Sequence, residues 1–137
     1  MGETVKILSY FDGSDRSLKA LAKAEGLLDL AQDELLLLMV IPKVKIEGME
    51  GFDQEHKKKM KDILDRQAEI LKGRAVHCRA FFEEGDIVDI IVNMADYYEV
   101  ATVVLGYQTE EKMSPFTVGS ISEEVSKRCH RPVLAIQ

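Results

Sequence analysis

The residues best suited to bind a ligand lie in the C-terminal third of the chain. An apolar run ends in Gly106, a polar stretch follows from Tyr107 to Thr117, and Gly119 then precedes Ser120. Glycine lets a ligand approach the backbone closely and adopts positive φ without steric cost. Ser120 is predicted to open a helix, whose N-terminus offers unpaired N–H groups and the positive end of the helix dipole. These features suit a bound anion such as a phosphate.

The same residue types also have an explanation that involves no ligand. Ser120 and Glu123 have the spacing of a capping box, in which the two side chains satisfy free N–H groups at the helix start. Asp12 follows the first apolar run and is equally suited to a turn or to a helix N-cap. The motif therefore leaves binding and capping open, and the position of these residues in the fold must decide.

Length and composition limit the class of protein. The 137 residues, 46% hydrophobic and 31% charged, predict one soluble globular domain over residues 1–137. A net charge of −6 argues against a broad nucleic-acid-binding surface, so no nucleic acid partner is expected. No apolar stretch approaches the roughly 18 residues of a membrane span, and the N-terminus lacks the apolar segment of a signal peptide. A cytoplasmic location without membrane attachment is therefore expected.

Five apolar or alternating runs predict strands, at residues 5–11, 35–41, 76–82, 100–105 and 132–136. Four helical patterns lie between them, beginning after Asp12–Ser14, at Asp53, at Gly85–Asp86 and at Ser120. Residues 42–52 show little pattern and are expected to form a loop. The first helix is expected to bury one broad face, made of Leu18, Leu21, Ala22, Ala24 and Leu28.

This alternation predicts an α/β fold, a single doubly wound domain whose five-stranded parallel sheet carries four helices on both faces. Residues 76–82 alternate between apolar and polar side chains, which is typical of an edge strand. Right-handed crossovers then give the strand order 3-2-1-4-5. The first and fourth strands lie side by side in this order, so Asp12 and Gly106 border the crevice in which such sheets bind ligands.

With this arrangement the chain resembles the universal stress protein family in its short single-domain form. The resemblance covers the whole chain and is densest at residues 5–14, 103–106 and 119–136. Nucleotide-binding members of the family carry glycine, two residues, glycine, nine residues, glycine, and then serine or threonine. Gly106, Gly119 and Ser120 fit this spacing, whereas Thr109 stands at the position of the middle glycine.

The resemblance implies a non-catalytic stress-response regulatory protein with a degenerate adenine-nucleotide site, for ATP or AMP, where the first and fourth strands meet. The base would lie near Val40, the adenosine beside Asp12, and the phosphates on the Gly106 loop and the Gly119–Ser120 helix start. Magnesium would enter such a site only together with bound phosphates.

Three residues of the polar stretch are expected to weaken ATP binding. Thr109 is β-branched and tolerates positive φ poorly, which the middle position of the motif calls for. Glu110 and Glu111 follow it and place two negative charges near the phosphates. The alternative is therefore a dimeric protein-interaction module that binds no nucleotide.

No set of residues predicts catalysis. His56, His77 and His130 are expected in a helix, an edge strand and a helix-to-strand corner, away from the crevice, so no general base can be named for slow ATP hydrolysis. No Walker A pattern and no metal-ligand spacing occurs. A response-regulator receiver shares the strand order, but the acidic and lysine residues that it needs at the strand ends are missing. An enzyme is therefore not expected.

The last predicted strand is a candidate for self-association. Residues 132–136 are apolar and uncharged, and the strand order places them at the sheet edge opposite the third strand. A bare edge of this kind invites pairing with a second copy across a two-fold axis. The resemblance implies the same contact, so a homodimer through residues 132–136 is expected.

Overall fold

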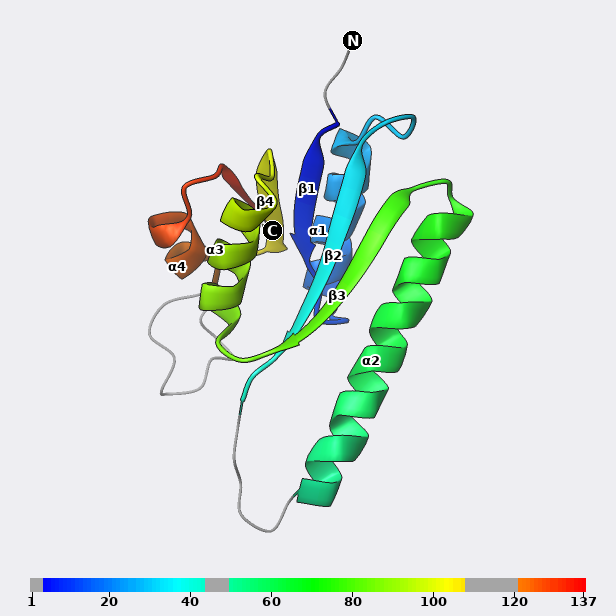
Figure 1. The fold of residues 1–137 in the computed structure, drawn as a ribbon, viewed down its shortest axis with the longest axis vertical. Coiled ribbons are helices and arrows are strands. Elements are labelled where there is room, and N and C mark those ends of the chain that lie inside the picture. Colours follow the sequence, from blue (N-terminus) through cyan, green and yellow to red (C-terminus); the bar gives the residue numbers. More distant parts are fainter. Residues whose placement is uncertain (1–3, 44–49, 108–120) are drawn as a thin grey trace.

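The structure is a computed structural model that describes residues 4–43, 50–107 and 121–137, with the backbone alone for residues 50–53. Strands and helices alternate along these residues (Figure 1). In chain order they are β1 (Lys6–Tyr10), α1 (Asp15–Leu27), β2 (Glu34–Ile41), α2 (Glu50–Gly73), β3 (His77–Glu84), α3 (Ile87–Tyr97), β4 (Thr102–Gly106), α4 (Ile121–Arg128) and β5 (Val133–Ile136).

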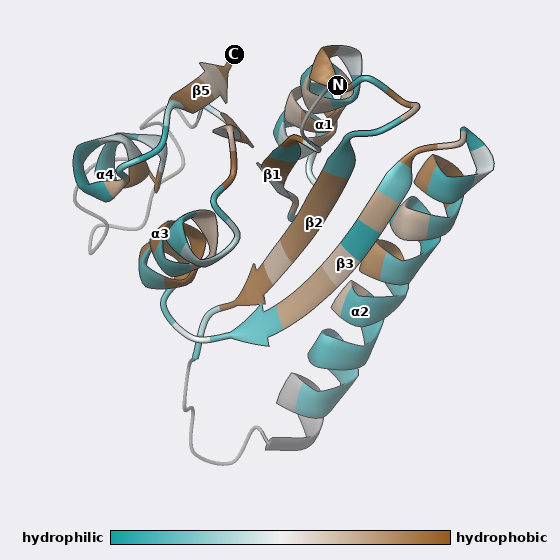
Figure 2. Cartoon of the chain, turned by 45° about the horizontal axis from the view of Figure 1, so that its top comes forward, coloured by the Kyte–Doolittle hydropathy of each residue, from teal (hydrophilic) through white to brown (hydrophobic). Residues whose placement is uncertain are grey.

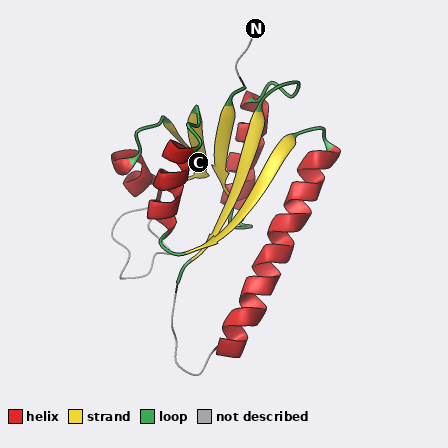
Figure 3. Cartoon of the chain, viewed as in Figure 1, coloured by secondary structure: helices red, strands yellow, loops and turns green. Residues whose placement is uncertain are grey.

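The sheet confirms the predicted fold class and strand order. Five parallel strands lie in the order β3-β2-β1-β4-β5, with helices on both faces (Figure 3). Helices α1 and α2 share one core cluster and therefore one face of the sheet, and α3 and α4 share the other. The direction in which strands are added reverses at β1, which has β2 on one side and β4 on the other. The switch point of the fold thus lies between β1 and β4.

Strand β2 forms the centre of both core clusters. Every residue from Leu35 to Ile41 is buried, and Figure 2 shows this strand as a continuous apolar band. Successive side chains of a strand point to opposite faces, so one uninterrupted run supplies both cores. Leu35, Leu37 and Met39 pack with α1 and α2, while Leu36, Leu38 and Val40 pack with α3 and α4.

The predicted buried face of α1 is confirmed for Leu21 and Ala24, and Leu28 packs against the core, but two of its residues are exposed. Leu18 is 40% exposed and Ala22 is exposed, whereas the buried residues are Ser17, Ala20, Leu21 and Ala24. This face keeps the helical spacing but consists mostly of small side chains. Small residues let the helix axis come close to the sheet, and apolar periodicity does not record that requirement.

Helix α2 begins earlier than expected. It starts at Glu50, so Asp53 is not its N-cap and residues 50–52 are not part of a loop. Residues 44–49 of the predicted loop lie outside the described residues. Gly51 weakens a helix by only about 1 kcal/mol relative to alanine, which a long helix tolerates.

Strand β3 is an edge strand, as its alternation predicted. Most of its side chains are exposed or half-buried, and Arg79 forms a bidentate ion pair with Glu34 on β2 at 2.9 and 3.1 Å. The long helix α2 runs along this strand on one face (Figure 1). Among the helices of the described residues, none is long and apolar enough to cross a membrane.

The core contains one polar atom without a partner among the described residues. The Ser9 hydroxyl, on the central strand β1, is fully buried and forms no hydrogen bond with them. An unsatisfied hydroxyl in a core costs about 1–3 kcal/mol. Ser9→Ala is therefore expected to raise the free energy of unfolding by about 1 kcal/mol, measured by urea titration.

Ser17→Ala provides the matched control. Ser17 is buried to a similar degree, but its Oγ donates a hydrogen bond to the Ser14 carbonyl oxygen at 2.9 Å. Its removal is expected to lower the free energy of unfolding by about 1 kcal/mol. If Ser9→Ala were as destabilising as Ser17→Ala, the Ser9 hydroxyl would have a partner in solution, such as a buried water molecule.

Candidate functional site

Strand register brings three of the predicted site residues to the same end of the sheet. Tyr10 pairs with Leu38, and the Phe11 amide donates to the Leu38 carbonyl oxygen at 2.8 Å. Two residues further along, this register places Asp12 level with Val40. On the other side of β1, Ser9 pairs with Val104. The same extension places Phe11 beside Gly106, so Asp12, Val40 and Gly106 flank the switch point.

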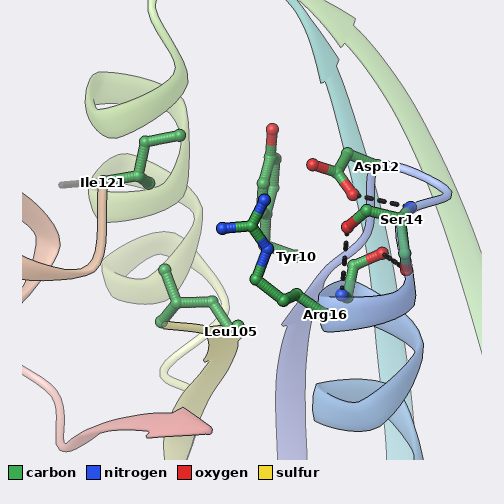
Figure 4. A pocket seen from close by; sticks show the side chains of 8 residues that line it. Tyr10, Asp12, Ser14, Arg16, Leu105 and Ile121 are labelled. Atoms are coloured by element: carbon green, nitrogen blue, oxygen red, sulfur yellow. Dashed lines mark hydrogen bonds between the residues drawn. The ribbon is translucent and has the colours of Figure 1, made fainter. Parts of the chain in front are cut away.

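The turn between β1 and α1 is fixed by its own hydrogen bonds, which Figure 4 shows. Asp12 Oδ1 accepts a hydrogen bond from the Ser14 amide at 2.9 Å, across Gly13 with its positive φ of +84°. Ser14 Oγ accepts from the Ser17 amide at 3.2 Å. Ser14 is therefore the N-cap of α1, and Asp12 holds the turn that precedes it.

A polar pocket opens at this switch point. It is a small opening, whose empty space of about 300 Å³ includes the adjoining open solvent, and it is bordered by the turn, the start of α1, the end of β4 and the first residue of α4 (Figure 4). Its lining residues are Tyr10, Asp12, Ser14, Arg16, Ser17, Leu105, Gly106 and Ile121. The pocket thus lies at the carboxyl ends of β1 and β4, where sheets of this topology bind ligands.

Gly106 has a structural role at this site that involves no ligand. A Cβ atom on this residue would lie 2.9 Å from the Arg16 carbonyl oxygen and 3.0 Å from Arg16 Cβ. Its φ is not positive, unlike those of Gly13 and Gly85. The backbone of α1 therefore needs glycine at residue 106 in order to pack against β4. The spacing of the motif alone does not reveal this cause.

Arg16 lines the pocket and was missed by the sequence analysis. Its half-buried side chain extends from α1 into the pocket. There it lies between the β1–α1 turn on one side and Leu105 and Ile121 on the other (Figure 4). No hydrogen bond or ion pair joins its guanidinium to another residue in the described part of the chain. The available signal was its place in the first turn of the helix that follows β1, since that turn faces the switch point.

Tyr10 and Asp12 give the pocket a second polar wall. Burial, reinforced by the negative charge of Asp12, raises the pKa of Tyr10 above its ordinary value. The phenol therefore stays neutral at physiological pH and remains a hydrogen-bond donor. Asp12 uses Oδ1 in the turn, and its second oxygen is available to a hydroxyl of a ligand.

The other predicted site residues contribute less, or lie outside the described residues. Val40 is only 3% exposed and packs in the core cluster of α3 and α4, so it offers little surface. Thr109, Gly119 and Ser120, together with Glu110 and Glu111, lie outside the described residues. The capping box of Ser120 and Glu123 is therefore not described either.

Residues with catalytic or metal-binding side chains do not gather at the pocket. Its lining contains no histidine and no cysteine. Within residues 4–43, 50–107 and 121–137, no group of three or more histidine, cysteine or acidic side chains has the geometry of a metal site. Cys78 and Cys129 are free thiols. The described lining residues thus offer hydrogen-bonding groups and charges.

Comparison with known proteins identifies the family that this fold and crevice indicate. The chain belongs to the universal stress protein family, whose model matches residues 4–137. Universal stress protein YxiE of Bacillus subtilis (strain 168) is 28% identical over 145 aligned positions, which cover 96% of this chain and 98% of YxiE.

Two solved structures share the fold. Universal stress protein UspA from Lactobacillus plantarum is 18% identical, with a TM-score of 0.77 and complete coverage of both chains. A universal stress protein solved in complex with cAMP is 21% identical, with a TM-score of 0.75 and 97% of each chain covered.

A pair of glycine substitutions tests the packing role of Gly106. Gly106→Ala is expected to lower the free energy of unfolding by about 1–3 kcal/mol without any ligand present, because the new Cβ atom collides with the backbone of Arg16. Gly26→Ala, in α1, is the control. No heavy atom lies within 4 Å of a Cβ there, so the change is expected to be neutral or to stabilise by up to about 1 kcal/mol.

Urea titration of the two ligand-free variants measures both effects. An unchanged stability of Gly106→Ala would mean that α1 does not press on the end of β4 in solution. The glycine would then have to be explained by ligand binding.

Proposed function

We propose that this protein is a non-catalytic regulatory protein that binds an adenine nucleotide in the switch-point pocket. The observation that carries the proposal is the pocket itself, a polar cavity at the carboxyl ends of β1 and β4 that contains both an acidic and a basic side chain. Two findings support the choice of ligand: this chain belongs to the universal stress protein family, and a universal stress protein with the same fold has been solved in complex with cAMP.

The lining residues suit different parts of such a ligand. The free oxygen of Asp12 is a partner for ribose hydroxyls, and Tyr10 adds a phenol beside it. Phosphates would lie toward Gly106, at the opposite wall of the pocket. Magnesium would be held chiefly by those phosphates, because the described residues offer no ready set of carboxylate ligands for it.

The proposal of a non-catalytic role rests on the chemistry of the lining. Hydrolysis needs a group that accepts a proton from water near the phosphate. Asp12 is the acidic residue of the lining, and one of its oxygens is already used by the Ser14 amide. The imidazole of a histidine, the commonest general base, is missing from the pocket as described.

The sequence of the polar stretch favours the alternative of a dimeric interaction module that binds no nucleotide, and the packing of Gly106 is compatible with it. Gly106 is fully accounted for by the close approach of α1, so this glycine needs no phosphate to explain it. In the sequence, Thr109, Glu110 and Glu111 also depart from the nucleotide-binding pattern. Binding measurements distinguish the two functions directly.

The nucleotide series provides that measurement. Glu110 and Glu111 are expected to oppose each added phosphate, at a cost on the order of 1 kcal/mol for each charge pair. Isothermal titration should therefore give AMP or adenosine the tightest binding, then ADP, then ATP, with AMP and ATP differing about tenfold or more. Tight ATP binding by the wild type would contradict the role given to the two glutamates.

A double variant tests the same residues in the opposite direction. Thr109→Gly with Glu110→Arg relaxes the backbone and reverses one charge, so ATP affinity should rise at least about tenfold while adenosine affinity changes little. Failure of both proteins to bind any of the four ligands would favour the interaction module.

We also propose that the protein is a homodimer joined through β5. This strand lies at the sheet edge beside β4 and consists of four uncharged residues. Its outer backbone groups can pair with a second copy across a two-fold axis. Val133, Leu134 and Ile136 are half-buried against the two core clusters, whereas Ala135 is exposed.

Ala135 is therefore the cleaner position for a test of the dimer. Ala135→Lys places a charge in the proposed contact without removing a packed side chain, and should shift the protein from dimer to monomer in sedimentation experiments. Ala22→Lys makes the same change at an exposed position of α1, and should leave the dimer intact. A wild type that is monomeric at about 100 μM would exclude this dimer.

A further inference from the structure

Arg16 is the cationic residue of the switch-point pocket, and its charge is not neutralised within the described part of the chain. Asp12 and Asp15 are close to it in sequence, yet neither forms an ion pair with it, although seven such pairs connect other described residues. The other polar groups of the turn, on Asp12, Ser14 and Ser17, already bond to one another. The guanidinium is thus a charged donor at the pocket that has no partner among the described residues.

The backbone of Arg16 is held in place from two sides. The capping hydrogen bonds of Ser14 fix the first turn of α1, and the surface of Gly106 packs against the Arg16 carbonyl group. A side chain that starts from a fixed backbone has fewer positions to choose from, so its charge is directed into the pocket with less loss of entropy on binding. Figure 4 shows it extending toward the space beside Leu105 and Ile121.

We infer that Arg16 binds the phosphate of the nucleotide and makes the pocket select adenosine phosphates over adenosine. The inference rests on the proposed function, and it adds the residue that determines specificity. A guanidinium presents two parallel N–H donors to two phosphate oxygens, a geometry that lysine cannot reproduce. A phosphomonoester such as AMP and a cyclic phosphodiester both offer such oxygens.

The opposite charges of the pocket also orient the ligand. The carboxylate of Asp12 repels a phosphate but accepts hydrogen bonds from ribose hydroxyls, whereas Arg16 attracts the phosphate. The ribose therefore lies against the β1 turn and the phosphate against Arg16, at the end of β4. One guanidinium matches one phosphate group, so the first phosphate contributes most of the selectivity.

A purely structural role for Arg16 makes a different prediction. The aliphatic part of the side chain could cover Leu105 and Ile121 while the charge remains in water. In that case loss of the charge would leave the affinities for AMP and adenosine in the same ratio. The ratio of the two affinities, and not either affinity alone, therefore tests the inference.

The experiment is isothermal titration of AMP and adenosine into four forms of the full chain. These are the wild type, Arg16→Gln, Arg16→Lys and the control Lys19→Gln, which removes an exposed charge one turn further along α1. The wild type should bind AMP at least about tenfold more tightly than adenosine. In Arg16→Gln the two affinities should agree within about twofold, with adenosine binding unchanged.

The two remaining forms sharpen the result. Arg16→Lys should keep part of the preference, because it retains the charge and loses the paired donors. Lys19→Gln should match the wild type. The wild-type preference for AMP should also fall as the ionic strength rises, while adenosine binding should not.

Each contrary outcome has one meaning. If Arg16→Gln keeps the wild-type ratio, the inference is overturned and the proposed function stands. If the folded wild type binds neither ligand, both are overturned. Should Arg16→Gln fail to fold, Arg16→Lys decides, because an unchanged AMP affinity in that variant would equally overturn the role of the guanidinium.

Discussion

The close contact between the start of α1 and the end of β4 is the constraint on which the switch point depends. There is no room for a Cβ atom at Gly106, because it would lie only 2.9 Å from the Arg16 carbonyl oxygen. The helix can therefore lie directly against the sheet, and its small buried residues, such as Ala20 and Ala24, continue the same close packing. The pocket exists because the helix start, the β1 turn and the end of β4 are brought together by this contact.

That contact also determines which groups are left for a ligand. The turn from Asp12 to Ser17 satisfies most of its own hydrogen-bonding groups, as helix starts commonly do. The second oxygen of Asp12 and the Tyr10 phenol remain available, and Arg16 carries a charge that no described residue neutralises. A pocket that is polar and mostly self-satisfied binds weakly in general, so one directed charge has a large effect on what it selects.

The sequence predicted the strands, their order and the location of the crevice, because each depends on local apolar patterns and on general rules of handedness. Sequence-based prediction was wrong, or incomplete, where burial or side-chain direction depends on the distance between a helix and the sheet. Leu18 was assigned to the buried face of α1 because apolar periodicity does not measure how closely a helix approaches a sheet. Arg16 was missed because the direction of a side chain is known only once that helix is placed. Asp12 was located correctly, but Ser14 takes the capping role.

Gly106 shows why a glycine motif and a charge carry different weight as signs of binding. The glycine is fully explained by packing within the protein, so its presence at the motif position agrees equally with a bound phosphate and with none. The half-buried guanidinium of Arg16 has no partner among the described residues, and partial loss of water around a charge is unfavourable unless another group replaces it. In this chain, Arg16 therefore indicates an anionic ligand more strongly than the glycine spacing does.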